Sequence, residues 1–306
     1  MKTFRFLPRA AAAALVVAAA CAASLPARAQ LRTPRPSQKA SVMQTIGVTD
    51  VTVTYSRPGV KGRKIWGDPP AGAPAGTATL DDARARPADA VIVPYGRVWR
   101  TGANEATTFT VTDDVFVNGQ PLKAGTYSLH TIPGRDEWTI IFNSDPGQWG
   151  GFAYDEKKDV LRVKAKPETA ADSQEWLAFQ IDPADETSAR VNIRWERLRV
   201  PFTVEVKDVP ALTLTKARAS VAAAKPDDWQ MPLQAASYLL NSKGDLTQAL
   251  AWAEQSIKAR ENFNNLNLKA RVLAAQGKTA EAVAAGEKAL QVGRAANANA
   301  QALAAF

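Results

Sequence analysis

Large apolar side chains recur at every second position between residues 42 and 206, and this period of two constrains the fold most. Val51, Val53 and Tyr55, for example, alternate with threonines, as expected for a strand with one buried face. Further runs of this kind occupy residues 107–111, 115–117, 127–132, 138–142, 160–163, 176–181, 191–195 and 202–206. Turn residues separate these runs and no helical period intervenes. We therefore predict a mostly β, antiparallel β-sandwich of jelly-roll-like type over residues 42–209.

After Pro210 the period becomes helical, and alanine, leucine, glutamine and lysine dominate. Residues 240–249 align with residues 273–282 at an offset of 33, and each segment contains one turn glycine, Gly244 or Gly277. A helix, a glycine turn and a second helix at this spacing are typical of tetratricopeptide-like repeats. We therefore predict a small all-α helical-repeat domain over residues 211–306. Two repeats are fewer than the roughly three that a free-standing solenoid needs, so this tail should dock on the sandwich, on a second copy or on a partner.

The first 29 residues have the order of a secretory signal peptide. Three basic residues precede an alanine-rich apolar run over residues 10–23, and a small-residue cleavage site ends at Ala29. We therefore expect a mature chain that begins at Gln30 and is exported to the periplasm or outside the cell. The apolar run is too short to span a bilayer comfortably, so no transmembrane segment is expected in the mature chain.

Cys21 leaves a second type of export open, because a cysteine that follows small residues can carry the lipid of a lipoprotein. The large aliphatic residue usual three positions before such a cysteine is missing, since that position is Ala18. Cleavage after Ala29 leaves a mature chain without cysteine. The fold must then be stabilised by its core rather than by disulfides.

The net charge names no partner class. The formal charge of +8 falls to about +4 when the four basic residues of the first 29 residues are removed, and no block of Lys or Arg is present. Such a mild excess favours solubility. Nucleic acid is therefore not expected as a partner of this exported chain.

Two segments lack the composition of a folded core. The chain from Gln30 starts with QLRTPRPS, and we expect an extended arm over residues 30–41. Residues 67–90 are dense in Gly, Pro and Ala and have almost no large apolar residue. Burial cannot offset the ordering entropy of such a segment, so we expect a flexible insert within the sandwich domain.

Arginines and aromatic residues are concentrated in YSRPGVKGRKIW (55–66) and PYGRVWRTGANEAT (94–107). Arginines beside aromatic rings can clamp a carboxylate, phosphate or sugar through forked hydrogen bonds and stacking. In the loop WGGFAYD (149–155), aromatic residues around two glycines can stack on a sugar ring. The predicted ligand-binding residues are Arg57, Arg63, Trp99, Arg100, Asn104, Trp149 and Tyr154. The alternative is that these side chains brace the loops or anchor them in the core.

His130 is the only histidine and would be the first candidate for a general base if the protein is an enzyme. Glu105 and Asp155 are the candidate carboxylates, and a hydrolase is the default reaction class. No Gly-x-Ser-x-Gly turn is present, and Ser128 lies two residues from His130 on one predicted strand, about 6.5 Å away. One histidine and no mature cysteine provide no usual zinc ligand set, so no metal and no cofactor are predicted.

Seven stretches of the chain carry a family resemblance. They are PSQKASVMQTIGVTDVTVTYSRPGVKGRKIW, VPYGRVWRTGANEAT, LKAGTYSLHTIPG, EWTIIFN, QWGGFAYD, DVLRVKAKP and RVPFTVEV, and they cover most of residues 36–206. In these stretches the chain resembles an exported bacterial family known only as domain of unknown function 2911. The resemblance implies export, the β domain and a helical-repeat tail, but no activity, substrate or catalytic residue. Members usually pass from KGRKIW to VPYGRVWR within a few residues, so the resemblance implies a surface insert at residues 67–90.

These observations predict a non-catalytic ligand-binding or interaction module of the cell envelope. The Arg and Trp loops would hold a small anionic or glycan-like ligand, and residues 211–306 would bind a protein partner. Two alternatives stay open. One is an uncharacterised hydrolase that uses His130 with Glu105 or Asp155, and the other is a structural scaffold whose partners bind the helical tail.

Overall fold

The computed structural model of the protein describes residues 33–69 and 90–296. The predicted signal peptide, Cys21 and the expected mature start at Gln30 lie outside the described residues. So do residues 70–89 of the predicted flexible insert and residues 297–306 of the predicted helical domain.

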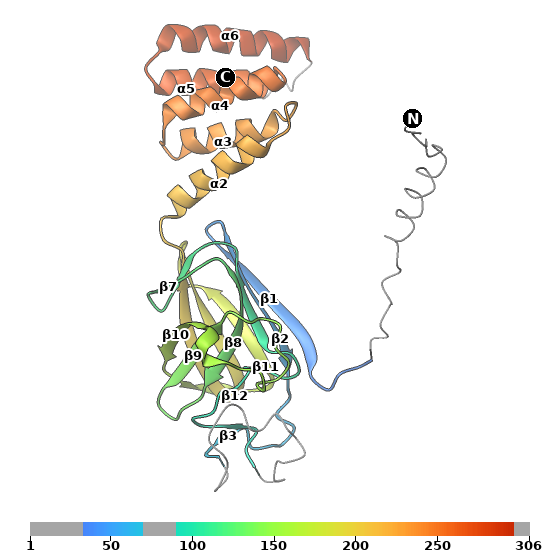
Figure 1. The fold of residues 1–306 in the computed structure, drawn as a ribbon. Coiled ribbons are helices and arrows are strands. Elements are labelled where there is room, and N and C mark those ends of the chain that lie inside the picture. The colour runs from blue at the N-terminus through green and yellow to red at the C-terminus, as the bar shows by residue number, and fades with distance from the viewer. Residues whose placement is uncertain (1–32, 70–89, 297–306) are drawn as a thin grey trace, which may run out of the picture.

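Two antiparallel sheets pack face to face, which confirms the predicted β-sandwich (Figure 1). The six-stranded sheet has the order β1 (Gln38–Ile46), β2 (Thr49–Arg57), β5 (Thr107–Val111), β8 (Gly125–Ile132), β9 (Trp138–Asn143) and β10 (Asp159–Ala165). The four-stranded sheet has the order β11 (Glu168–Pro183), β12 (Ser188–Glu205), β6 (Val115–Val117) and β7 (Gln120–Leu122). After β5 the chain crosses to the second sheet for the β6–β7 hairpin and then returns for β8.

The alternating pattern separates an inner face from an outer face in each sheet. In β5, Phe109 and Val111 are buried in the core, whereas Thr108 and Thr110 lie on the other face. Strand β12 contributes Trp195 from the opposite sheet to the same core. One core therefore fills the space between the sheets and fixes the strand register, since a slip of one residue would turn the apolar set outward.

Strand β1 begins at Gln38, four residues before the strand predicted from Val42, and so it takes up part of the predicted arm over residues 30–41. Residues 33–37 precede it without helix or strand. The strand pairs with β2 along its full length, from Gln38 opposite Arg57 to Ile46 opposite Thr49. Main-chain pairing thus orders a polar segment whose side chains bury little, and composition does not reveal such pairing.

A short parallel pair flanks the predicted insert. Strands β3 (Trp66–Gly67) and β4 (Val93–Pro94) pair in parallel, and Gly67 O accepts a hydrogen bond from Tyr95 N at 2.8 Å. The two ends of the intervening segment are therefore held side by side at one end of the sandwich (Figure 1).

The tail contains five helices: α2 (Val209–Ala223), α3 (Gln230–Asn241), α4 (Leu246–Ala259), α5 (Phe263–Ala275) and α6 (Thr279–Ala295). The starts of α3 and α5 are 33 residues apart, and so are those of α4 and α6. Gly277 has the left-handed φ of +78° that the α5–α6 turn requires. The two predicted helix–turn–helix units are confirmed, with α2 as an additional helix in front of them.

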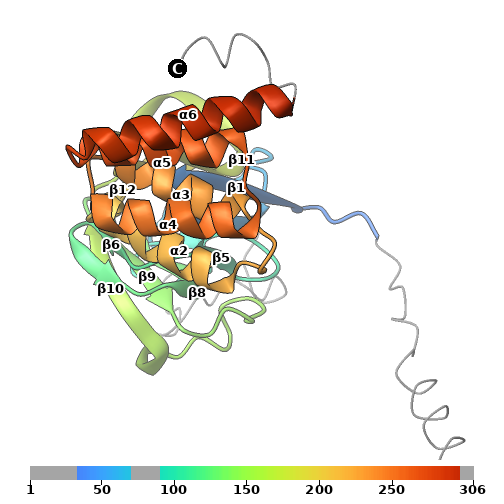
Figure 2. The same ribbon diagram turned by 90° about the horizontal axis from the view of Figure 1, so that it is seen from above.

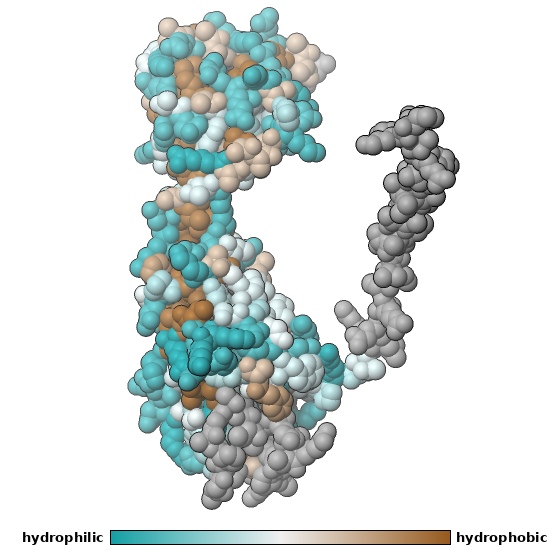
Figure 3. All heavy atoms as spheres, in the orientation of Figure 1, coloured by the Kyte–Doolittle hydropathy of each residue, from teal (hydrophilic) through white to brown (hydrophobic). Residues whose placement is uncertain are grey.

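Helix α2 docks the tail on one end of the sandwich, and the other helices stack above it (Figures 1 and 2). Val209 packs against Gly47, which has a φ of +59° and whose Cβ, if present, would lie 2.7 Å from Val209 Cγ2. Lys216 Nζ donates to Asp113 Oδ2 at 2.6 Å and to the carbonyl of Val48 at 2.7 Å. Hydrophobic residues gather on the surface around this connection (Figure 3).

Docking on the sandwich was one of the three alternatives for the tail. A protein partner through residues 211–306 stays a prediction.

Within the described parts of the chain, no helix combines the length and the hydropathy needed to cross a membrane.

Asp113 is the centre of the junction. Burial would raise the pKa of its carboxyl, but the hydrogen bonds from Lys216, Thr49 and Thr112 outweigh burial and hold that pKa below its ordinary value. The charge pair therefore stabilises the docked state of α2.

Lys216→Met should lower the free energy of unfolding by about 1 kcal/mol, because a partly exposed, hydrogen-bonded charge pair is lost. It should also speed hydrogen exchange in α2. Urea unfolding and amide exchange measure both effects. Arg218→Met, which changes an exposed cation on the same helix, is the matched control. Equal effects of the two substitutions would contradict the assigned role of Lys216.

Candidate functional site

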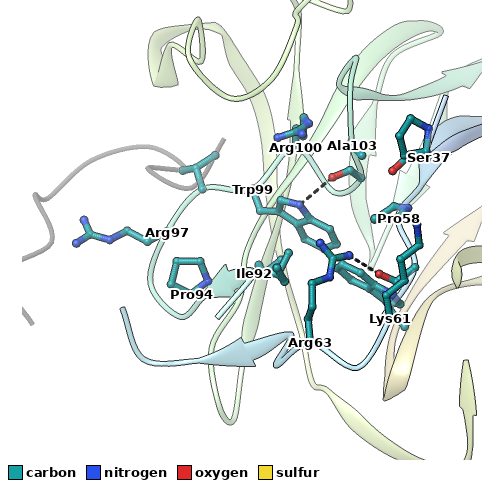
Figure 4. A pocket seen from close by; sticks show the side chains of 16 residues that line it. Ser37, Pro58, Lys61, Arg63, Ile92, Pro94, Arg97, Trp99, Arg100 and Ala103 are labelled. Carbon is teal, nitrogen blue, oxygen red and sulfur yellow. Dashed lines mark hydrogen bonds between the residues drawn. The ribbon is translucent and has the colours of Figure 1, made fainter. Parts of the chain in front are cut away.

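A pocket of about 290 Å³ lies near the β3–β4 end of the sandwich, between the two motif segments (Figure 4). The first segment contributes Pro58, Gly59, Lys61 and Arg63, and the second contributes residues between Pro94 and Ala103. Residues 36, 37, 92 and 93 and Trp195 of β12 also line the pocket. We call this hollow the Arg/Trp pocket. The two segments that the sequence singled out therefore meet at one concave surface.

Trp99 and Trp195 form the base of the pocket, and Trp66 and Trp138 pack against them. Trp99 stacks on Trp195 with ring centroids 5.8 Å apart and an interplanar angle of 17°. Trp66 packs edge-on against Trp99, Trp138 and Trp195 at centroid distances of 5.7, 5.2 and 5.6 Å. The indole Nε1 of Trp99 donates to the carbonyl of Gly102 at 3.1 Å. The base is therefore apolar, flat and fixed.

Four cationic residues line the Arg/Trp pocket: Lys61, Arg63, Arg97 and Arg100. None of its lining residues within the described chain is a carboxylate. Arg63 donates from Nη2 to the carbonyl of Gly59 and from Nε to the carbonyl of Val60, so its guanidinium is fixed beside Trp99 (Figure 4). Arg97 extends away from the other labelled side chains. Burial lowers the pKa of Arg100 to about 10, which still leaves it charged at neutral pH. The pocket therefore suits an anion that also has a flat or apolar part.

Arg57 and Asn104 are braces rather than pocket residues. Arg57 Nε donates to the carbonyl of Leu177 at 2.8 Å and so ties β2 to the other sheet. Asn104 has a φ of +58°, and its Nδ2 donates to the carbonyl of Ser37 at 3.1 Å. Because Ser37 lines the pocket, Asn104 acts on the pocket wall through the backbone.

Trp149 and Tyr154 lie outside the Arg/Trp pocket, in the loop between β9 and β10. Trp149 is 57% exposed, and Arg35 lies 5.8 Å from its ring centroid. Glu105 pairs with Trp149 across an isolated bridge and accepts both Nη1 hydrogen bonds from Arg35, at 2.7 and 2.9 Å. Although burial opposes it, Arg35 holds the pKa of Glu105 below its ordinary value. The structure therefore divides the predicted ligand-binding residues between two surfaces.

The β9–β10 loop folds over the outer face of the six-stranded sheet. Tyr154 Oη donates to Asp159 Oδ2 at 2.6 Å, and Asn143 Nδ2 donates to Asp159 Oδ1 at 2.8 Å. Burial and this bond to Asp159 raise the pKa of Tyr154. Asp155 accepts from Lys157 N as the N-cap of the short 3₁₀ helix η1 (Glu156–Lys158). This capping role accounts for the Asp155 carboxylate without catalysis.

His130 is fully buried beneath this loop, with its ring centroid 5.0 Å from that of Tyr154. Neither ring nitrogen has a hydrogen-bond partner in the described structure, and Ser128 Oγ is likewise buried without one. Burial lowers the pKa of His130 to about 4; the charge of Arg100 acts in the same direction, and Asp159 and Asp145 oppose it. No hydrogen bond therefore joins His130 to Glu105 or Asp155.

Sequence reasoning missed Trp195 as a site residue, because it stands in an alternating strand and resembles any other core residue. Lys61 and Arg97 belong to the predicted motif segments but were not singled out there. Their shared signal was the density of cations in these segments, and both residues are among those that line the pocket.

A family model described as a protein of unknown function (DUF2911) matches residues 37–204. The chain belongs to the DUF2911 family. The match covers the strands from β1 to most of β12 and both segments of the Arg/Trp pocket, whereas the helices follow it. No curated protein and no solved structure gives a significant match. For this DUF2911 protein the site must therefore be interpreted from its own geometry.

Among the residues that the structure describes, no group of three or more His, Cys, Asp and Glu side chains is placed to hold a metal ion.

The buried His130 predicts a specific pH dependence of stability. Its pKa is about 4 in the folded protein against 6.5 for the free side chain, so the unfolded chain binds more protons between these values. Stability is therefore lost as the pH falls from about 6.5 towards 4. The shift corresponds to roughly 2–3 kcal/mol at pH 4.5.

Urea unfolding at pH 7.5 and pH 4.5, for wild type and His130→Asn, tests this expectation. The drop in unfolding free energy between the two pH values should be smaller in His130→Asn by about 2 kcal/mol. An identical drop in both proteins would show that His130 does not carry the effect.

Proposed function

We propose that this DUF2911 protein is a non-catalytic ligand-binding module that holds a small organic anion in the Arg/Trp pocket. One observation carries the proposal: the cations Lys61 and Arg63 and two stacked tryptophans line a single hollow, and none of its lining residues within the described chain is a carboxylate. An anion there would face positive charge on its polar side and the indole surface of Trp99 on its flat side.

The ligand class follows from the two halves of the pocket. Guanidinium groups match carboxylate and phosphate oxygens by paired hydrogen bonds, which favours these groups over chloride. The tryptophan base favours a ligand with a ring or other flat apolar part over inorganic phosphate. An aromatic or multiply charged carboxylate is therefore the expected type of ligand.

The hydrolase alternative has less support. The proposed base His130 is enclosed, its nitrogens have no hydrogen-bond partner in the described chain, and Glu105 is paired with Arg35. Asp155 caps η1. These three residues therefore do not form an acid–base pair in this conformation, which favours binding over catalysis.

Binding should be measured by tryptophan fluorescence and calorimetry, with benzoate, citrate and inorganic phosphate as probes. Trp99 and Trp195 line the pocket, so ligand binding should change the emission. We expect saturable binding that is tightest for a carboxylate and weakens with added salt.

Lys61→Met should weaken the binding five- to tenfold, which corresponds to about 1–1.4 kcal/mol. Lys64→Met removes the same charge from an exposed side chain of the same segment that does not line the pocket, and it should leave affinity unchanged. Failure of all three probes to bind, or an equal loss in both variants, would refute the assignment.

We also propose that the protein works outside the cytoplasm, as the first 29 residues indicate. Amino-terminal sequencing of the protein recovered from its native host should begin at Gln30. A start at Cys21 with an attached lipid would instead support the lipoprotein alternative, and an intact Met1 would exclude both.

A further inference from the structure

A second hollow, of about 180 Å³, lies on the outer face of the six-stranded sheet and does not share a lining residue with the Arg/Trp pocket. Thr54 and Ser56 of β2 and Thr108 of β5 line it from the sheet side. Gln148 of the β9–β10 loop lines it from the other side. We call it the outer-face hollow.

Gln148 leaves an unused acceptor in this hollow. Its Nε2 donates to Asn143 Oδ1 and to the carbonyl of Asp145, both at 3.1 Å, and these two bonds fix which end of the amide is oxygen. Gln148 is only 4% exposed, and its Oε1 is buried without a hydrogen-bond partner within the described residues. Leaving a buried acceptor unpaired is costly, so the position calls for a donor from a ligand or solvent.

The unpaired atoms continue beneath the loop. Thr108 lies opposite Ser128 in the β5–β8 register, and Ser128 Oγ has no hydrogen-bond partner among residues 33–69 and 90–296. His130 follows on the same face, and neither of its ring nitrogens has a hydrogen-bond partner in those ranges. A row of buried polar groups therefore begins at the outer-face hollow and runs into the sheet surface.

The charge of the outer-face hollow is balanced, unlike that of the Arg/Trp pocket. Lys39 and Glu105 line it with one charge of each sign. The loop that forms its wall is held by main-chain bonds from Ala106 N to Gln148 O at 2.9 Å and from Gly150 N to Asn104 O at 3.0 Å. Trp149, which pairs with Glu105, is exposed but does not line the hollow.

We propose that the outer-face hollow binds one neutral, hydroxyl-rich sugar ring. Gln148 Oε1 and the Glu105 carboxylate accept from ring hydroxyls, Lys39 donates to them, and Thr108 and Ser56 exchange hydrogen bonds with them. A hydroxyl both donates and accepts, which matches this mixture of groups better than an anion does. The site is independent of the anion pocket, so either can fail alone.

Saturation-transfer NMR and calorimetry with N-acetylglucosamine, methyl β-glucoside and myo-inositol test the proposal on the full mature chain. Thr108→Val keeps the shape of the side chain and removes its hydroxyl, and it should weaken binding at least fivefold. Thr110→Val is the matched control. It lies two residues along the same face, and its hydroxyl bonds to that of Thr126 outside the hollow, so binding should be unchanged.

Lys39→Met changes an exposed lining residue and is a second variant. It removes an ammonium donor to the ring hydroxyls, so it should weaken binding of the same sugars. Chitotetraose, a chain of four N-acetylglucosamine units, distinguishes a free sugar from a glycan chain as the ligand. Equal affinity for the tetramer and for N-acetylglucosamine supports a free sugar, and a gain above tenfold supports a glycan chain that continues beyond the hollow. No saturable binding of any sugar, or equal losses in Thr108→Val and Thr110→Val, would overturn the proposal.

Discussion

The packing of Trp195 against Trp66 and Trp99 is the contact on which the candidate site depends. Trp195 comes from the four-stranded sheet, whereas Trp66 and Trp99 stand in the two motif segments. Each aromatic pair contributes about 0.5–1.5 kcal/mol beyond the burial of its area. Because these rings are held between the sheets, two segments that are distant in sequence meet at one hollow, lined by Lys61 and Arg63 of the first and Trp99 of the second.

One pair of backbone hydrogen bonds lies between the Arg/Trp pocket and the outer face of the six-stranded sheet. Trp99 and Thr131 exchange both backbone hydrogen bonds at 2.8 Å. The Trp99 side chain turns into the tryptophan cluster, and the next residue, Arg100, turns the opposite way (Figure 4). The same backbone pairing sets Arg100 across from His130, whose protonation its charge opposes. The Arg100 side chain therefore belongs to the surroundings of the buried histidine, although the residue is also among those that line the anion pocket.

The fold could be predicted because its signals are periodic. The alternation in β5 and β12 gives each strand one buried face, and the 33-residue repeat of the tail corresponds to two matching pairs of helices. The DUF2911 match covers the sandwich. Side-chain roles were less accessible. Arg57 and Arg63 stand in one motif, yet Arg57 bonds to a carbonyl of the other sheet while Arg63 lines the pocket. Which role an arginine takes depends on the partner that the fold brings near it, and a local sequence does not contain that partner.

The same limit explains Trp149 and β1. Trp149 was grouped with Trp99 by composition, but its loop crosses the outer face of the sheet. The early start of β1 depends on hydrogen bonds to β2, which leave no hydrophobic pattern. The prediction that His130 and Ser128 lie on one strand is confirmed by β8, but the enclosure of His130 comes from a loop that begins after β9.

The parallel pairing of β3 and β4 gives the chain a splice point. Gly67 and Pro94 are register partners, so whatever connects them enters and leaves at one spot. For a connection closed in this way, doubling its length adds only about 0.6 kcal/mol of closure entropy. Evolution can therefore lengthen or exchange this connection with little effect on the core of the sandwich. A reporter peptide inserted into it would lie beside the anion pocket.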